Sequence, residues 1–201
     1  MMAAALANLT LYVIRHGECE HNVAGLAAAQ NDSPLTDTGR AQARANGALL
    51  KELAGDLSQF DFFASSLHRT CNTMELAREG AGLSPTGYRA DRRLMEIDYG
   101  DHTWMTKDDI LRLSNRPAGP SSWGDWDYVR PGGESWADVH ARVGRFLATL
   151  TRDAVIVTHF GTARMIRAHY LDLTPQQASD HSPAHAGIMR LSAGSETWFG
   201  D

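Results

Sequence analysis

The chain contains two short apolar segments that each run into a histidine with a glycine close behind it. The first lies within Leu11–Gly17 and the second within Ala154–Gly161. Short, continuous, β-branched runs of this kind are typical of buried strands in a parallel sheet. Ligand sites of open α/β sheets lie just beyond the carboxyl ends of such strands. If the two strands are neighbours, about 5 Å apart, the rings of His16 and His159 can face one ligand.

The rest of the sequence alternates strand and helix patterns, which favours a mostly parallel sheet covered on both faces. Its 201 residues suffice for one α/β domain, and no linker or internal repeat divides them. Thr36 and Asp37 are possible N-terminal caps of the helix expected at Gly39–Leu53. Ser135 with Asp138 resembles a capping box. We expect strands at Leu9–Ile14, Phe60–Ser65, Thr86–Ala90, Ala154–Thr158 and Gly187–Leu191, and helices at Gly39–Leu53, Leu67–Glu79, Ser135–Leu150 and Thr162–Leu171.

The segment Tyr99–Gly133 has a different composition, rich in Gly, Pro, Trp and Asp. We expect it to be an insertion that contains a short helix at Lys107–Leu113. Long excursions from a compact domain are often lids or binding loops, but a plain surface loop held by aromatic anchors remains the alternative. The residues that carry this prediction are Trp104, Trp123, Trp126, Pro117, Pro120 and Pro131.

Composition narrows the class of protein. The formal net charge is −5 and no basic stripe is present, which argues against a nucleic-acid partner. No apolar run approaches the roughly 18 residues of a membrane span, so no membrane partner is expected. The N-terminus lacks the basic start and apolar core of a signal peptide. Two cysteines, Cys19 and Cys71, form no disulfide framework and favour the cytoplasm. Whether the chain forms a homodimer is left open.

Several kinds of catalytic site are excluded by their missing motifs. The sequence has no His-Glu-x-x-His, and the spacing of His181 and His185 stands alone, so no metal is expected. Neither cysteine is followed by Arg at the sixth position, as a cysteine phosphatase requires. A Gly-x-Ser-x-Gly elbow, a phosphate-binding Gly-Lys-Ser/Thr loop and a dinucleotide fingerprint are also missing. Histidine beside arginine therefore remains as nucleophile or base, without a cofactor.

Arginine next to the histidine suggests a dianionic substrate, because guanidinium matches phosphate oxygens with paired hydrogen bonds. Arg15 precedes His16 directly, and Arg69 follows the second strand at the start of a helix, where free amides favour an anion. A leaving alkoxide needs a proton donor. Glu96, flanked by apolar residues that can raise its pKa, is our choice over the more solvated Asp98 and Asp101.

These residues resemble the signature of the histidine phosphatase, or phosphoglycerate-mutase-like, superfamily. The matching motifs occur in family order across nearly the whole chain. They are Arg15-His16-Gly17-Glu18 with Asn22, Pro34-Leu35-Thr36 with Gly39 and Gln42-Ala43, Ser65-Ser66-Leu67-His68-Arg69-Thr70, Leu94-Met95-Glu96-Ile97-Asp98-Tyr99-Gly100, Gly132-Gly133-Glu134-Ser135 and Val157-Thr158-His159.

The resemblance implies a three-layer α/β/α fold and a phosphohistidine mechanism that uses no metal. His16 would accept the phosphoryl group and Glu96 would donate the proton. The phosphoryl oxygens would be held by Arg15, Arg69 and His159, and Asn22 would be a pocket contact.

One position departs from the family pattern. Many members have Gly directly after the second histidine, where this chain has Phe160 and places Gly161 one position later. The Phe160 amide is expected to reach the phosphate, and its ring to narrow the pocket or line it for an apolar leaving group. Chain length and Gly-Gly-Glu-Ser favour the phosphatase branch and a small phosphorylated metabolite as substrate. A cofactor-dependent mutase is the alternative, and a non-catalytic phospho-ligand binding module ranks below both.

Overall fold

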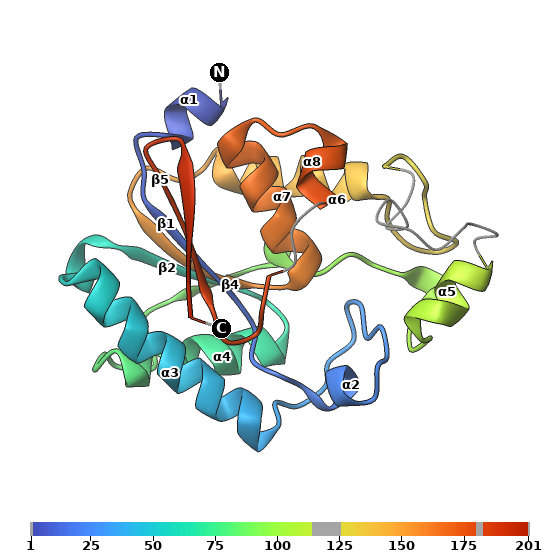
Figure 1. The fold of residues 1–201 in the computed structure, drawn as a ribbon, viewed down its shortest axis with the longest axis horizontal. Coiled ribbons are helices and arrows are strands. Elements are labelled where there is room, and N and C mark those ends of the chain that lie inside the picture. Colours follow the sequence, from blue (N-terminus) through green and yellow to red (C-terminus); the bar gives the residue numbers. More distant parts are fainter. Residues whose placement is uncertain (1, 114–125, 180–182, 201) are drawn as a thin grey trace.

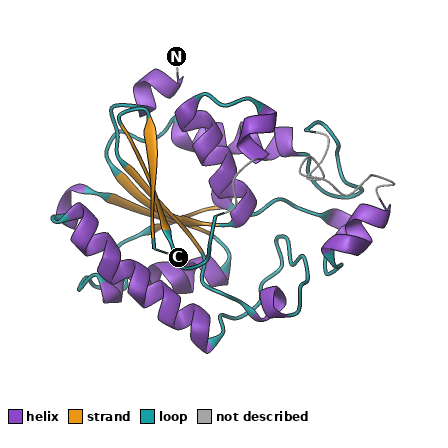
Figure 2. Cartoon of the chain, viewed as in Figure 1, coloured by secondary structure: helices purple, strands orange, loops and turns teal. Residues whose placement is uncertain are grey.

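A six-stranded mixed sheet forms the centre of the protein in the computed structural model, which describes residues 2–113, 126–179 and 183–200 (Figure 1, Figure 2). The strand order is β3-β2-β4-β1-β5-β6. The first four of these strands are parallel, whereas β5 runs antiparallel to β1 and β6 antiparallel to β5. The strands are β1 (Leu11–Arg15), β2 (Asp61–Ser65), β3 (Arg89–Asp91), β4 (Ala154–Thr158), β5 (Ile188–Ser192) and β6 (Ser195–Phe199).

Helices cover both faces of this sheet, which gives the expected three-layer α/β/α arrangement. One face carries α3 (Asp37–Ala54) and α4 (His68–Gly80), and the other carries α6 (Trp136–Leu147) and α7 (Phe160–Leu171) (Figure 1). The shorter elements are α1 (Met2–Leu6), α2 (Glu20–Val23), α5 (Lys107–Leu113), α8 (Pro175–Ser179) and the 3₁₀ turns Leu57–Gln59, Arg92–Leu94 and Gly100–His102.

The two hydrophobic cores follow from the two-residue period of a strand. In β1, Leu11 and Val13 join the core beneath α6 and α7, whereas Tyr12 and Ile14 join the core beneath α3 and α4. The same alternation holds in β4, where Ile156 faces the first core and its neighbours face the second. Because both faces are buried, these strands are continuously apolar, and this is why the sequence pattern revealed them.

Helix ends agree with the expected caps. Thr36 accepts a hydrogen bond from the Gly39 amide at the start of α3. Ser135 and Asp138 form the capping box at the start of α6. The third strand differs from expectation, since Gly87 has a φ of +97°, which is incompatible with a strand, and β3 begins only at Arg89.

Strand β6 was not predicted from the sequence. It is joined to β5 by a two-residue turn in which Ala193 and Gly194 have φ values of 49° and 72°. Positive φ at both central positions is the geometry of the tightest hairpin turns. The signal in the sequence was only Gly194, with alanine rather than the usual Asn or Asp before it, which explains why the hairpin was missed.

The insertion contains the short helix that we expected, α5, at Lys107–Leu113. Trp126 packs against the core as an anchor, whereas the Trp104 side chain is exposed at the surface. Our expectations for Pro117, Pro120 and Trp123 lie outside the described residues. Within the described part of the chain, no helix is long and apolar enough to cross a membrane.

The close packing of α3 on α4 yields a stability prediction. A Cβ at Gly47 would lie 1.9 Å from the carbonyl oxygen of Ala77 in α4. Gly47→Ala should therefore destabilise the protein by about 1–3 kcal/mol, even though alanine is the better helix former. Urea unfolding measures this change, and Glu52→Ala on the exposed side of α3 should stay within about 0.5 kcal/mol of the parent. An unchanged Gly47→Ala would contradict the packing described.

Candidate active site

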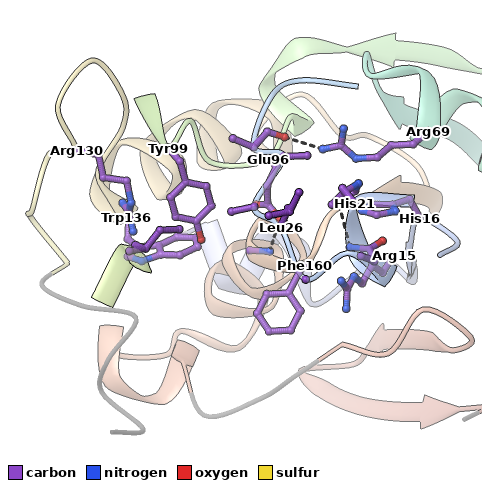
Figure 3. A pocket seen from close by; sticks show the side chains of 17 residues that line it. Arg15, His16, His21, Leu26, Arg69, Glu96, Tyr99, Arg130, Trp136 and Phe160 are labelled. Atoms are coloured by element: carbon purple, nitrogen blue, oxygen red, sulfur yellow. Dashed lines mark hydrogen bonds between the residues drawn. The ribbon is translucent and has the colours of Figure 1, made fainter. Parts of the chain in front are cut away.

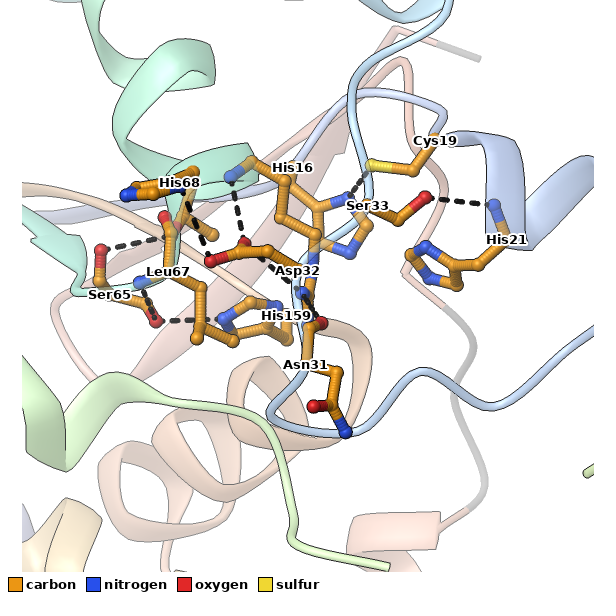
Figure 4. A network of polar contacts seen from close by, with 12 residues as sticks. His16, Cys19, His21, Asn31, Asp32, Ser33, Ser65, Leu67, His68 and His159 are labelled. Carbon is orange, nitrogen blue, oxygen red and sulfur yellow. Dashed lines mark hydrogen bonds and ion pairs between the residues drawn. The ribbon is translucent and has the colours of Figure 1, made fainter. Parts of the chain in front are cut away.

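The pairing of β1 with β4 brings the two strand-end histidines together. The strands are parallel, with Arg15 opposite Thr158, and the His16 amide donates to the Thr158 carbonyl at 2.9 Å. The rings of His16 and His159 lie 5.2 Å apart between centroids, and both side chains are buried (Figure 4). The two histidines of the sequence pattern thus form one constellation.

Glycine follows His16 because the chain passes very close to another backbone there. A Cβ at Gly17 would lie 2.3 Å from the carbonyl oxygen of Gly39, and one at Gly39 would lie 2.0 Å from the Glu18 carbonyl. The Gly17 amide donates to the Thr73 hydroxyl of α4 at 3.1 Å. This contact fixes the turn after β1 against α3 and α4, and with it the position of the His16 side chain.

The hydrogen bonding of His16 defines its tautomer. Its Nδ1 lies 2.8 Å from the Gly17 carbonyl oxygen, which only accepts, so Nδ1 carries the proton. The lone pair is then on Nε2. Burial lowers the pKa of His16 well below 6.5, and His159, Arg69 and Arg15 lower it further. At neutral pH the imidazole is therefore uncharged and suited to act as a nucleophile.

Two arginines, of which Arg69 is buried and Arg15 is half-buried, place positive charge beside His16. Arg15 donates to the Pro183 carbonyl at 3.0 Å and lies over the Phe160 ring at 5.0 Å, and burial lowers its pKa to about 10, so it stays protonated. The Nη groups of Arg69 donate to the carbonyls of Asn31 and Ala29 at 2.6 and 2.7 Å. Arg69 Nη1 also lies 3.6 Å from Asp32 Oδ1, and this ion pair balances part of its charge. The carbonyl partners of both arginines are neutral, so positive charge remains available to an anion.

The His159 side chain is held by a hydrogen bond to the end of β2. It lies at the N-terminus of α7, and its Nε2 is 2.8 Å from the Ser65 hydroxyl at the end of β2. Burial lowers the pKa of His159 well below its usual value, and the charges of Arg69 and Arg142 add to this effect. Its Nδ1 is buried and bonds to no described residue. His159 is thus a neutral, positioned ring beside the candidate nucleophile.

Glu96 lies on the segment after β3 and is held by the N-terminus of α7. Its two carboxyl oxygens accept from the amides of Ile97 and Gly161, each at 3.0 Å. A Cβ at position 161 would lie 2.6 Å from Glu96 Oε1 and from the Trp136 ring. Glycine is therefore needed at position 161.

The backbone around Glu96 is fixed by an ion pair that comes from the Gly-Gly-Glu-Ser motif. Glu134 pairs with Arg142 of α6, with an Oε1–Nε distance of 2.8 Å and an Oε2–Nη2 distance of 3.0 Å. Arg142 Nη2 also donates to the Glu96 carbonyl at 3.0 Å, and Gln30 donates to the same oxygen at 3.1 Å. Glu134 and Arg142 therefore position the loop that carries Glu96.

Asn22 lies on the wall of the site, but its side chain is already engaged. Its Oδ1 accepts from the Cys19 amide at 3.0 Å, and its Nδ2 donates to His21 Nε2 at 2.9 Å. His21 is buried and its ring centroid lies 5.9 Å from that of His16 (Figure 4). Because Nε2 of His21 accepts, its proton is on Nδ1. Asn22 thus orients a third histidine of the site.

These residues surround one pocket with a volume of about 280 Å³ (Figure 3). Arg15, His16 and Arg69 lie at one end, and Tyr99, Arg130 and Trp136 lie at the other. Four buried nitrogens around His16 bond to no described residue, and they belong to Arg15, His21, Arg69 and His159. Buried donors without partners are rare and costly. In the described part of the chain, no three His, Cys, Asp or Glu side chains gather to hold a metal ion.

All seven site residues named from the sequence lie in or against this pocket: Arg15, His16, Asn22, Arg69, Glu96, His159 and Phe160. His159 does not line the cavity itself, but its ring lies beside that of His16, which does. Sequence reasoning missed His21, Arg130, Trp136 and His185, whose Nδ1 is 2.7 Å from the His16 carbonyl oxygen. The signal for the first three was only their adjacency to the motifs, and His185 had none.

Comparison with known proteins agrees with this geometry. Residues 11–200 match the family described as the histidine phosphatase superfamily (branch 1). A 2,3-bisphosphoglycerate-dependent phosphoglycerate mutase of Sinorhizobium fredii is 32% identical over 185 residues, covering 84% of this chain and 82% of the mutase. One from Azorhizobium caulinodans is 37% identical over 134 residues, covering 66% of this chain and 64% of the mutase.

Solved structures give similar matches. The protein of open reading frame Rv3214 from Mycobacterium tuberculosis has a TM-score of 0.77 and 29% identity, covering 96% of both chains. A mycobacterial glucosyl-3-phosphoglycerate phosphatase complexed with VO3 has a TM-score of 0.74 and 29% identity, covering 96% of this chain and 97% of that one. The chain therefore belongs to the histidine phosphatase superfamily.

The buried neutral histidines predict that the protein loses stability in acid. Burial lowers the pKa of His140 to about 4, and it lowers the pKa values of His16 and His159 well below the usual 6.5. Below pH 6.5 these histidines bind protons in the unfolded chain but not in the folded chain. The stability that they contribute is therefore present above that pH and is lost as the pH falls. Each fully buried histidine should remove about 1.4 kcal/mol per pH unit.

Chemical unfolding between pH 7 and pH 4 measures this dependence. His140→Gln should flatten the curve, because it removes one histidine whose protonation opposes folding. Ala45→Gln, on the exposed side of α3, changes no titratable group and should leave the slope unchanged. A free energy of unfolding that stays constant down to pH 5 would contradict the assignment of buried neutral histidines.

Proposed function

We propose that this protein is a phosphomonoesterase that hydrolyses a small phosphorylated metabolite through a phosphohistidine on His16. The observation that carries the proposal is the neutral His16 imidazole, with Nδ1 bonded to the Gly17 carbonyl, beside the buried Arg69 and the half-buried Arg15. Arg15 and Arg69 would stabilise the phosphoryl oxygens electrostatically, and positioning together with charge supplies most of phosphoryl-transfer catalysis. Phosphatases among the structural neighbours support hydrolysis.

In the proposed reaction, His16 Nε2 attacks phosphorus as the ester oxygen leaves on the opposite side. Glu96 gives its proton to that oxygen, and the alcohol departs. Water then attacks the phosphohistidine, Glu96 takes a proton from it, and inorganic phosphate and neutral His16 are restored. The amides of Ile97 and Gly161 hold the Glu96 carboxyl in one orientation through both steps.

A mutase is the second candidate, favoured by the phosphoglycerate mutases among the relatives. The two functions differ in the acceptor of the phosphoryl group. A mutase would convert 3-phosphoglycerate into its isomer and would depend on a bisphosphate primer, whereas a phosphatase would release inorganic phosphate without one. Measuring isomer and free phosphate in the same reaction separates the two.

Removal of the proposed nucleophile is the direct test. In chelator, His16→Ala should release phosphate from phenyl phosphate roughly a thousandfold or more slowly than the parent, because the acceptor atom is lost. Glu52→Ala, at an exposed residue of α3, should keep the parent rate. An acid-labile, base-stable label on the parent protein after brief mixing with labelled ester would identify phosphohistidine. An unchanged rate in His16→Ala would refute the proposal.

The Glu134–Arg142 pair predicts a dependence on the leaving group. Glu134→Gln should displace the Glu96 loop and weaken protonation of the leaving oxygen, a contribution of roughly 10²–10⁴ in general acid catalysis. Alkyl phosphates, whose alkoxides need that proton, should slow far more than dinitrophenyl phosphate, whose phenolate does not. Rates with both esters measure the effect, and Glu79→Gln in an exposed ion pair is the matched control. An equal loss on both esters would indicate a general structural defect instead.

A further inference from the structure

The far end of the pocket contains a buried arginine that the proposed mechanism does not use. Arg130 is 7% exposed and lines the same cavity as His16. Its guanidinium lies 4.8 Å from the centroid of the Tyr99 ring and 5.5 Å from that of the Trp136 ring. In Figure 3 these three side chains lie at one end, and Glu96, Leu26 and Phe160 separate them from Arg15, His16 and Arg69.

The hydrogen bonding of Arg130 leaves donors available to a ligand. Its Nη1 donates to the Glu134 carbonyl at 2.9 Å. Its Nε and Nη2 groups bond to no other described residue, yet they retain accessible surface, unlike the enclosed nitrogens around His16. Arg130 also forms no ion pair with a described carboxylate. A guanidinium fork with two open donors beside a cavity matches a planar anion.

The walls between the two charged ends indicate what connects them in the ligand. Leu26 and Phe160 lie between the two ends, and Tyr99 and Trp136 lie at the far end (Figure 3). Ala27 and Ile110 also line the pocket. These surfaces are apolar or aromatic and suit a flat, apolar body. The cavity volume of about 280 Å³ lies near the lower limit of ligand pockets, roughly 300 Å³, so the whole substrate must be small.

We propose that the Arg130 end of the pocket is a specificity subsite for a single carboxylate on the substrate, which is a small phosphomonoester with a flat apolar body. This inference rests on the proposed function, because it takes the His16 end as the phosphoryl site. Charge distribution favours a carboxylate over a second phosphate. Among the arginines that line the pocket, one lies at the far end and two lie at the His16 end. Glu96 and Glu134 lie near enough to Arg130 to interact with it electrostatically. A dianion there would meet their repulsion.

Matched esters test the subsite. The first pair of probes is 4-(carboxymethyl)phenyl phosphate and its carboxamide. Its methylene group insulates the phenol from the carboxylate charge, so both leaving groups have similar pKa values. The second pair has one further methylene. The parent protein should prefer the carboxylate roughly tenfold or more in kcat/KM, mainly through KM, as expected for a charged hydrogen bond. Arg130→Gln should reduce this preference to about threefold or less while turnover of the carboxamide persists. Arg130→Lys should keep part of the preference.

The controls separate this inference from the proposed function. Arg145→Gln, at an exposed arginine of α6, should retain the full preference. Calorimetry of both esters with His16→Ala measures the carboxylate preference without turnover, so the subsite can be tested even if the parent hydrolyses neither ester, an outcome that would refute the phosphatase alone. Equal kcat/KM and equal binding of carboxylate and carboxamide at both lengths would overturn the inference. So would a preference that survives unchanged in Arg130→Gln.

Discussion

The parallel pairing of β1 with β4 is the contact on which the site depends. The two strands run through the middle of the sheet, and their last residues are in register, so the segments that follow them leave the sheet side by side. Hydrogen bonds of the strand end extend this order outward: the Thr158 hydroxyl donates to the Leu94 carbonyl at 2.8 Å, and Thr162 donates to the Met95 carbonyl at 2.7 Å. One strand end therefore holds both His159 and the segment that leads to Glu96.

Positive charge is gathered at this edge of the sheet without full compensation. Arg15 and Arg69 donate mainly to backbone carbonyls, with Asp32 3.6 Å from Arg69, and their Nε groups are enclosed without a described partner. A buried guanidinium costs free energy unless an anion accompanies it. The same burial keeps His16 neutral. The free energy that burial of these guanidinium groups costs in the free protein is recovered when a dianionic ligand binds beside them. Folding and the proposed chemistry are connected in this way.

A second layer of interactions holds the candidate acid. The Gly-Gly-Glu-Ser motif touches the pocket only indirectly, yet Glu134 and Arg142 hold the carbonyl of Glu96 while Gly161 holds its carboxyl group. Arg130 and Trp136 flank the same motif and reach the far end of the pocket. The motif therefore links the orientation of the proton donor to the shape of the distal end. The insertion Tyr99–Gly133 therefore contributes to the site through Arg130 near its end.

The sequence alone determined the elements whose signals are local. Continuous apolar runs predicted β1, β2 and β4 because both faces of these strands are buried, and the caps at Thr36 and Ser135 are short-range contacts. The motifs also indicated the seven site residues. Tertiary structure alone decided the rest. The neutral state of His16, the orientation of His21, the place of His185 and the arrival of Arg130 at the pocket depend on burial and on segments far apart in the chain. No local pattern encodes such contacts, because their energy arises only when those segments pack together.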